Sequence, residues 1–532
     1  MVSNEVLKSA QTTVKSGTIL TIGQVLSTLI SFLTTLFVIK LLGEEQYGLY
    51  ALVLVPISLI MLFCGLGVPP ALTKYVAWFR ARNHVYELKK ILVSGFIFIC
   101  LTGILLSIVT YILADPIAMF YQKPETAPLI KIVSLVLFAG AIYRVAWNTF
   151  LGLEKTKYNA AMLVINAIIK GGLALTLVLL GYGVFGAILG YLAGYFASAT
   201  LGIIFVPREI SKYKDNKATS LNAGKSLAWK DTFSLLLGFG FPLAIVNVVG
   251  GFGKQFYNFL AGKYCSKWDF GNYNAAVTLL IPLPVLGMPI MAVMFPAYSK
   301  IDGAKEQELL DSAFKLAVKY TALLIVPVAA LIMGLSEPLK SIIFGGRFPD
   351  APRYLMLLAF AYLFTPFGYL NFSSLFKGQG RTKILLVGGL LGLMVGIPAS
   401  LVLIPLLGII GLIFTNIIVT VVVIVFNNII VKVKLGITIE FASSVKILLA
   451  GVFTAFATYF LQLWIVSYPV VELLVAGLVG FGVYVLFILV SGALTIEDVH
   501  NLKVIFRGIR PLRRVLKPHA RRIEEILRKV LE

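Results

Sequence analysis

Two neighbouring apolar stretches of the sequence each contain one cation and one asparagine, side chains that donate hydrogen bonds to anions and hydroxyl groups. Asn148 follows Arg144 by four positions, and Lys170 in turn follows Asn166 by four. This spacing places both members of each pair on one face of a helix. A Lys or Arg in the middle of a membrane span costs about 2.5–3.5 kcal/mol on insertion scales, so it normally faces a cavity or a partner. Because no apolar stretch has an Asp or Glu in its interior, the sequence predicts an anionic ligand as the missing partner.

The elements that carry these residues have the composition of membrane helices. The chain of 532 residues is 59% hydrophobic and 13% charged, whereas soluble domains are about half apolar and about a quarter charged. Apolar runs long enough to cross a bilayer recur along its whole length. The sequence therefore predicts an all-α polytopic membrane protein with about fourteen transmembrane helices. We expect them near residues 16–38, 47–68, 91–113, 130–151, 159–180, 184–206, 240–262, 273–296, 316–336, 354–375, 384–404, 409–431, 445–466 and 470–491.

The positive charge of the chain is unevenly distributed. Most of the 46 Lys and Arg residues, which give a net charge of +22, fall on one side of the predicted membrane. The positive-inside rule makes that side the cytoplasm. We therefore expect a multi-pass protein of the cell membrane with both termini in the cytoplasm, in contact with the anionic inner leaflet and without a nucleic-acid partner. The first apolar run is too long for a signal peptide and should remain as the first membrane helix.

Short motifs of the first half recur in order in the second half at nearly constant spacing. Tyr47-Gly48 returns as Phe270-Gly271, and Asp115-Pro116 returns as Glu337-Pro338. The recurrence predicts two pseudo-symmetric six-helix lobes of equal orientation, with the substrate site between them, plus two C-terminal helices. The expected parts are an N-lobe (1–206), a cytoplasmic linker (207–232), a C-lobe (233–431), helices 13 and 14 (432–492) and a basic amphipathic tail (493–532).

Two of these parts allow alternative interpretations. Helices 13 and 14 either extend a hydrophobic groove for a lipid tail or bury the edge of a lobe. The tail either lies on the inner leaflet as an amphipathic helix or is solvated.

A polar stripe in the first helix recurs in the seventh. The first stripe consists of Gln24, Thr28, Ser31 and Thr35, and the second of Asn247, Gly251, Lys254 and Asn258. Equivalent stripes are expected on facing walls of a cavity, although Ser, Thr and Asn also make ordinary hydrogen bonds between membrane helices, worth about 1 kcal/mol each. At the spacing of the repeat Arg144 corresponds to Leu370 and Lys170 to Gly396, so the lobes differ in charge. This difference favours a specific anion-binding role over packing.

The residues required for enzyme chemistry are missing from the sequence. Three Cys and three His form neither a disulfide framework nor a metal cluster. There is no P-loop, no Ser/His/Asp arrangement and no paired Asp motif. We expect no catalytic activity, no metal and no cofactor. The lack of membrane carboxylates disfavours transport that is coupled to an ion bound by such groups. Transport coupled to sodium held by backbone carbonyls, or driven by the membrane potential, remains an alternative.

Two motifs and the layout of two times six plus two helices carry a family resemblance. The motifs are the run Leu41-Leu42-Gly43-Glu44-Glu45-Gln46-Tyr47-Gly48-Leu49-Tyr50 and the Gly-Leu-Glu-Lys-Thr-Lys turn at 152–157. The chain resembles the polysaccharide-transport (oligosaccharide flippase) family of the multidrug/oligosaccharidyl-lipid/polysaccharide exporter superfamily. The resemblance implies alternating access, a cationic central cavity, and a substrate that is an oligosaccharide on a polyprenyl phosphate or pyrophosphate carrier. It carries Arg144, Lys170 and Lys254 over as the cations of that cavity by position and residue type.

The sequence thus predicts a flippase that moves a lipid-linked oligosaccharide from the inner to the outer leaflet. The expected substrate-binding residues are Arg144, Lys170, Lys254, Asn148, Asn166, Gln24, Asn247 and Asn258, with Tyr143 and Trp147 as candidates for stacking on sugar rings. Candidate partners are glycosyltransferases or a polymerase of the same pathway. The alternatives are an ion-coupled multidrug exporter of the same superfamily and a scaffold subunit of a glycan-assembly complex that transports nothing itself.

Overall fold

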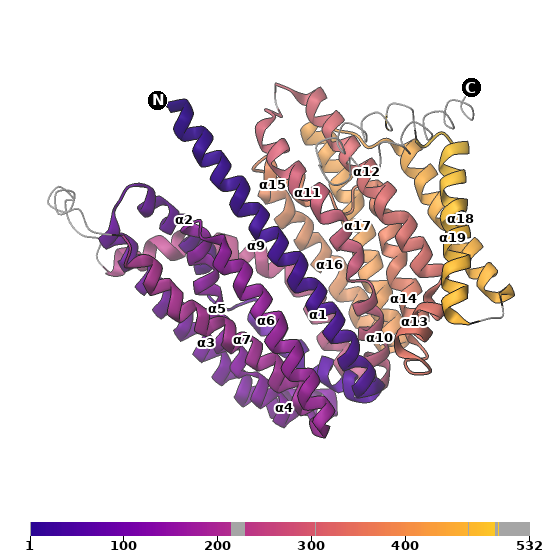
Figure 1. The fold of residues 1–532 in the computed structure, drawn as a ribbon, viewed down its shortest axis with the longest axis horizontal. Coiled ribbons are helices and arrows are strands. Elements are labelled where there is room, and N and C mark those ends of the chain that lie inside the picture. Colours follow the sequence, from indigo (N-terminus) through magenta and orange to yellow (C-terminus); the bar gives the residue numbers. More distant parts are fainter. Residues whose placement is uncertain (1, 214–228, 304, 466–467, 495–497, 499–532) are drawn as a thin grey trace. The chain divides into compact units, whose positions relative to one another are not determined.

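Every regular element is a helix in the part of the chain that the computed structural model describes, residues 2–213, 229–303, 305–465, 468–494 and 498 (Figure 1). This confirms the predicted all-α fold. Residues 214–228 of the predicted linker, and the predicted amphipathic tail apart from residues 493, 494 and 498, lie outside the described residues.

Eleven helical stretches are long and apolar enough to cross a membrane, or twelve if one bent pair counts as a span. The polytopic architecture is therefore confirmed, and the count of fourteen stays a prediction. Ser16–Met61, with 46 residues, contains the first predicted span and most of the second, 47–68. Thr156–Ile210, with 55 residues, contains two of the predicted spans. Non-helical glycines interrupt both stretches, Gly43 (φ 74°, ψ −177°) in the first and Gly181 (φ 91°, ψ 3°) in the second.

Packing divides the chain into two compact units. Unit 1 comprises Met1–Thr278 and Gly389–Asn416, and unit 2 comprises Leu279–Gly388 and Ile417–Glu532. The elements of unit 1 are α1 (Val2–Met61), α2 (Val68–Ala81), α3 (Val85–Tyr121), α4 (Thr126–Val133), α5 (Leu135–Gly152), α6 (Thr156–Leu177), the π-turn η1 (Val178–Tyr182), α7 (Gly183–Ile210), α9 (Trp229–Tyr264), most of α10 (Lys267–Leu279), and most of α16 (Thr382–Leu407) with the start of α17 (Ile409–Leu435). The elements of unit 2 are α11 (Pro282–Lys300), α12 (Gln307–Gly334), α13 (Ser336–Phe344), α14 (Ala351–Phe360), the 3₁₀-helix η2 (Ala361–Phe367), α15 (Phe372–Gly378), the rest of α17, α18 (Phe441–Trp464) and α19 (Pro469–Val490).

Helices α1, α6 and α7 pack side by side in unit 1 (Figure 1). Glycines allow their backbones to approach closely. A Cβ atom at Gly171 of α6 would lie 2.3 Å from the hydroxyl of Thr34 in α1, and one at Gly190 of α7 would lie 2.6 Å from the Cβ of Ala174 in α6. Small residues at such crossings are typical of membrane helix packing.

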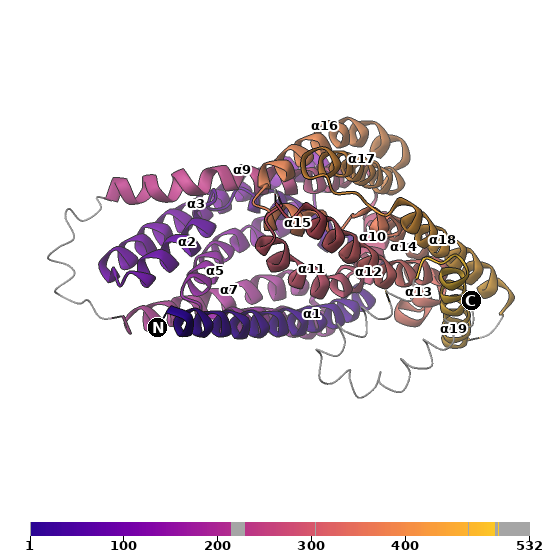
Figure 2. The same ribbon diagram turned by 90° about the horizontal axis from the view of Figure 1, so that it is seen from above.

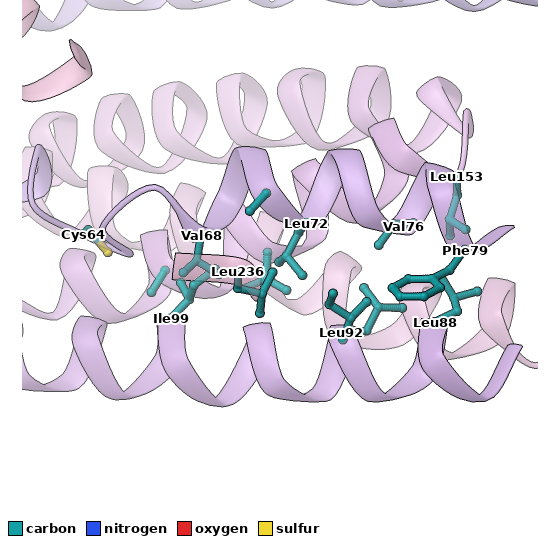
Figure 3. Packing of buried hydrophobic residues seen from close by; sticks show 14 residues of the cluster. Cys64, Val68, Leu72, Val76, Phe79, Leu88, Leu92, Ile99, Leu153 and Leu236 are labelled. Atoms are coloured by element: carbon teal, nitrogen blue, oxygen red, sulfur yellow. The ribbon is translucent and has the colours of Figure 1, made fainter. Parts of the chain in front are cut away.

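One apolar cluster of unit 1 joins α2, α3, α5 and α9. Leu72 and Phe79 of α2 are buried against Leu92 and Ile99 of α3, with Leu236 of α9 in the same cluster (Figure 3). Helix α9 runs past α2 and α3 (Figure 2). Sequence analysis missed α2 as a separate helix, because its fourteen residues are too few for a membrane span.

The repeated Gly48 and Gly271 meet each other in unit 1. A Cβ atom at Gly48 would lie 1.8 Å from the carbonyl oxygen of Lys267, and one at Gly271 would lie 2.0 Å from the carbonyl oxygen of Glu44. At the same spacing that relates the glycines, Glu44 corresponds to Lys267. Each glycine therefore contacts the residue that corresponds to the contact of the other glycine. Reciprocal contacts of this kind are typical of a twofold axis.

Helix α12 is central to the packing of unit 2, where it contacts α11, α14, η2, α18 and α19. Phe314 of α12 packs against Phe372 of α15, with ring centres 5.6 Å apart. A Cβ atom at Gly334 would lie 1.8 Å from the hydroxyl of Thr458 in α18, so this crossing also depends on a glycine. The short α13 was not predicted, for the same reason as α2.

Candidate functional site

Lys170 lies on α6 beside a small cavity within unit 1. Its ammonium nitrogen is 4.9 Å from the centre of the Tyr191 ring of α7, which is a cation–π contact. The cavity is about 20 Å³, room for about one water molecule. Besides Lys170, five residues with hydroxyl groups line this cavity: Ser31, Thr34, Thr35, Tyr47 and Tyr50. Two members of the predicted stripe of the first helix, Ser31 and Thr35, thus line the same cavity as Lys170.

A row of four aromatic rings leads from α5 to Lys170. Trp147 stacks on Tyr143, with ring centres 5.9 Å apart, and Tyr143 meets Tyr195 edge-on at 6.0 Å. Tyr195 is 5.3 Å from Tyr191, the ring beneath Lys170. Tyr143 and Trp147 contact one another, and their stacking on sugars stays a prediction.

Arg144 is half-buried on α5, next to Tyr143 in the chain. Asn148, one turn later, donates from Nδ2 to the carbonyl oxygen of Arg144 at 2.8 Å. Its side-chain oxygen accepts a hydrogen bond of 3.0 Å from the hydroxyl of Thr73 in α2. Asn148 therefore ties α2 to α5, a structural role that leaves only one of its amide hydrogens for a ligand.

Asn166 and Lys170 occupy the α6 face that meets α7. A Cβ atom at Gly194 of α7 would lie 2.8 Å from the Cβ of Lys170 and 3.0 Å from the carbonyl oxygen of Asn166. The absence of a side chain at Gly194 therefore makes room for this turn of α6. The structure therefore places the turn of α6 that carries Asn166 and Lys170 at the crossing with α7.

The remaining predicted residues lie on α1 and α9. Gln24 is exposed, and its amide is 3.4 Å from the hydroxyl of Thr28 one turn later. Asn247 and Lys254 are also exposed, and neither lines the cavity of Lys170. Asn258 has a buried side-chain oxygen without a hydrogen-bond partner among the described residues, as expected of a group that awaits a ligand or water.

Two other lysines of unit 1 have a carboxylate partner, which Arg144, Lys170 and Lys254 lack among the described residues. Lys131 pairs with Asp115 at 2.7 Å, and Lys267 pairs with Glu125 at 2.9 Å. Within the described part of the chain no carboxylate lies within ion-pair distance of Arg144, Lys170 or Lys254. The site therefore offers hydrogen-bond donors and positive charge without a competing anion. The described residues contain no group of three His, Cys, Asp or Glu that could hold a metal ion.

Sequence analysis missed the tyrosines around Lys170. Tyr191 and Tyr195 are spaced one helical turn apart, and Tyr47 and Tyr50 are three positions apart. Such spacing places each pair on one helix face. The spacing of the tyrosines could have indicated two aromatic helix faces. Only the structure shows that these faces meet at Lys170.

Solved structures of membrane transporters share this fold. A lipid II flippase MurJ in an inward closed conformation superposes with a TM-score of 0.69 and 17% identity, over 88% of this chain and 97% of that chain. A multidrug resistance MATE family transporter in an inward-facing conformation gives 0.58 and 19%, over 76% of this chain and 94% of that one.

The chain belongs to the polysaccharide biosynthesis protein family, whose model matches residues 37–353. The model of the lipid II flippase MurJ matches residues 271–480. The succinoglycan biosynthesis transport protein ExoT of Rhizobium meliloti is 24% identical, over 67% of both chains. The stage V sporulation protein B of Bacillus subtilis is 24% identical over 58% of this chain and 61% of its own. A probable low-salt glycan biosynthesis flippase, Agl15 of Haloferax volcanii, is 24% identical over 21% of this chain and 25% of its own.

Proposed function

We propose that this protein is a flippase that moves a lipid-linked oligosaccharide from the inner to the outer leaflet by alternating access. One observation carries the proposal: three cations within membrane spans have no carboxylate partner among the described residues. A polyprenyl phosphate or pyrophosphate would supply the missing negative charge. The names of the relatives, which include a succinoglycan transport protein and a probable glycan flippase, support this substrate class.

In this proposal the donors have different tasks. Arg144 offers a bidentate fork to a phosphate group, and Lys170 offers a point charge. Asn166, Asn247 and the buried amide of Asn258 would hydrogen-bond sugar hydroxyls. Gln24, Asn247 and Asn148 are the weaker candidates, because Gln24 and Asn247 are exposed and Asn148 already binds Thr73 and the Arg144 carbonyl.

The size of the cavity at Lys170 fits a transporter that changes conformation. A space of about 20 Å³ holds a water molecule but no phosphate. Lys170 would therefore meet its ligand only after α1 and α6 move apart, and Tyr191 would stabilise the cation meanwhile. Such an exchange of accessible and closed states is what alternating access requires.

The test is leaflet transfer by the purified full chain in vesicles. The probe is a short polyprenyl pyrophosphate that carries a fluorescent disaccharide, and its arrival in the outer leaflet is measured with a membrane-impermeant quencher. We expect transfer by the wild type, and a loss of at least about tenfold in Arg144→Gln and Lys170→Met, since each removes a charge-assisted interaction. Lys131→Gln is the matched control, because Asp115 already neutralises this lysine.

Two outcomes would contradict the proposal. Absence of transfer by a folded wild type would favour the scaffold alternative. Transfer of cationic dyes, but not of the pyrophosphate lipid, would favour the multidrug exporter.

A further inference from the structure

A deep apolar groove of about 560 Å³ lies within unit 2, remote in sequence from the cations of unit 1. Phe364 and Phe367 of η2 form one wall, and Val425 and Ile429 of α17 form the other. Phe441, the first residue of α18, also lines it. The volume falls within the range of about 300–1,000 Å³ that is typical of ligand pockets.

Local backbone features and hydrogen bonds fix the walls of the groove. The 3₁₀-helix η2 ends at Gly368 (φ 86°), where the span bends by 45° towards α15. Asn428 of α17 donates from Nδ2 to the carbonyl oxygens of Phe367 and Ile424, at 3.1 and 2.9 Å. Ser444 of α18 donates to the carbonyl oxygen of Pro366 at 2.6 Å. Hydrogen bonds therefore hold α17 and α18 against η2 and fix the shape of the groove.

The side chains of one wall are open to the surroundings. Val425 is 53% exposed, Ile429 56% and Phe441 66%. Val425 and Ile429 belong to a helix that is long and apolar enough to cross the membrane. At such positions the surrounding medium is lipid hydrocarbon, so an acyl chain is the chemically matched occupant.

One end of the groove is positively charged. Lys432, in the last turn of α17, lines the groove and is exposed. The nearby carboxylates are already occupied: Asp311 binds Lys315 and the backbone N–H of Thr438, and Glu440 lies 4.0 Å from Lys319. Within the described residues Lys432 has no carboxylate partner. The ammonium group is thus available to an anionic headgroup.

We propose that this groove binds one anionic phospholipid of the membrane, with an acyl chain between η2 and α17 and the headgroup phosphate on Lys432. The site differs from the groove predicted for helices 13 and 14, since α19 does not line it. It is also separate from the proposed binding of the transported lipid by unit 1. The occupant would stabilise the bent span next to α17.

The experiment measures lipid retention on the purified full chain by native mass spectrometry. Probes are phosphatidylglycerol and phosphatidylcholine with identical acyl chains. We expect one phosphatidylglycerol to be retained in preference to phosphatidylcholine. Val425→Trp should fill the groove and remove both lipids, whereas Val433→Trp, at a 75% exposed position that does not line the groove, should leave retention unchanged.

A second pair of variants tests the headgroup contact. Lys432→Gln should reduce the preference for phosphatidylglycerol about fivefold, the typical effect of one basic residue near anionic lipid. Lys434→Gln, in the same helical turn but outside the groove, should leave it unchanged. Thermal unfolding of each variant confirms that it is folded.

Three results would overturn the proposal: equal loss of lipid in Val425→Trp and Val433→Trp, equal preference in Lys432→Gln and wild type, or displacement of the retained phospholipid by a polyprenyl phosphate added at the same concentration. The last result would assign the groove to the transported lipid.

Discussion

Two lysines within membrane helices, Lys170 in unit 1 and Lys319 in unit 2, differ in whether a carboxylate neutralises them. In unit 1 Arg144, Lys170 and Lys254 have no carboxylate partner among the described residues. In unit 2 Lys319 of α12 is 2.5 Å from Asp498 and 4.0 Å from Glu440. Both side chains of the close pair are largely buried, Lys319 with 11% and Asp498 with 5% exposure.

This difference shows that a lysine in an apolar helix can have either of two roles: it can form a structural ion pair, or it can remain available to a ligand. Lys319 forms a largely buried ion pair with a residue far away in the sequence. Lys170 is surrounded by hydroxyl groups and an aromatic ring, which tolerate a cation but do not neutralise it. We therefore expect replacement of Lys319 to lower stability, and replacement of Lys170 to lower function.

The largest effect is expected from Lys319→Met. The substitution removes the Lys319 ammonium group from the buried carboxylate of Asp498, which should lower the free energy of unfolding by about 3–5 kcal/mol. Thermal unfolding of the purified protein measures the loss. The double variant Lys319→Met, Asp498→Leu should recover most of it, because no buried charge then remains. If the single and double variants are equally unstable, the ion pair is not the cause.

Lys170→Met should have the opposite profile. The substitution leaves no carboxylate without a counter-charge, so the free energy of unfolding should stay the same or rise. Leaflet transfer of the pyrophosphate lipid should fall about a hundredfold, since loss of one partner of a desolvated charge pair costs about 2–5 kcal/mol. Lys170→Arg should retain part of the transfer. A Lys170→Met protein that is unstable but fully active when folded would remove the contrast between the units.

Glycine crossings provide a test in which the two units should behave alike. A side chain at Gly171 in unit 1 or Gly334 in unit 2 would collide with a threonine hydroxyl of the neighbouring helix. Gly171→Ala and Gly334→Ala should each lower the free energy of unfolding by about 1–3 kcal/mol. Gly172→Ala is the control, since its Cβ atom would have no heavy atom within 4 Å. A large loss in only one unit would show that packing also differs between them.

The exposed ion pair of unit 1 should have the smallest effect. The hydrogen bond from Lys267 lowers the pKa of Glu125, and partial burial opposes it. Because the folded-state pKa is depressed, the pair stabilises the protein above the ordinary pKa of Glu and loses this effect as the pH falls through the folded-state value. Glu125→Gln should therefore lower the free energy of unfolding by less than about 1 kcal/mol at neutral pH. The difference from wild type should vanish once the pH lies well below the folded-state pKa of Glu125. A difference that persists in acid would assign the effect to something other than charge.

The membrane helices could be predicted from sequence because apolar runs of sufficient length have few other solutions. The unpaired cations could be predicted as well, since the apolar segments around Arg144 and Lys170 contain no acid. Short elements such as α2 could not be separated from the spans beside them. The break between the first two predicted spans (16–38 and 47–68) corresponds to a kink at the non-helical Gly43, where two helices join directly.

The partners of individual side chains depend on tertiary contacts that the sequence does not display. Asn148 is bonded to Thr73, which lies 75 positions earlier. Lys319 is bonded to Asp498, and nothing in the local sequence of either residue indicates the other. Tyr191 lies below Lys170 only because Gly194 lets α6 and α7 approach closely. Packing therefore decides which polar residues remain available for a ligand.

The mutual contact of Gly48 and Gly271 also restricts which substitutions can be accepted at these two positions. Each glycine sits against the backbone of the segment that carries the other, so neither can acquire a side chain unless the opposing copy is displaced. Two sequences that arose from one ancestor would thereby have lost their independence at this point. In two such halves, sequence drift elsewhere, including the difference between Arg144 and Lys170 in one half and Leu370 and Gly396 in the other, could proceed while this contact kept the halves in register.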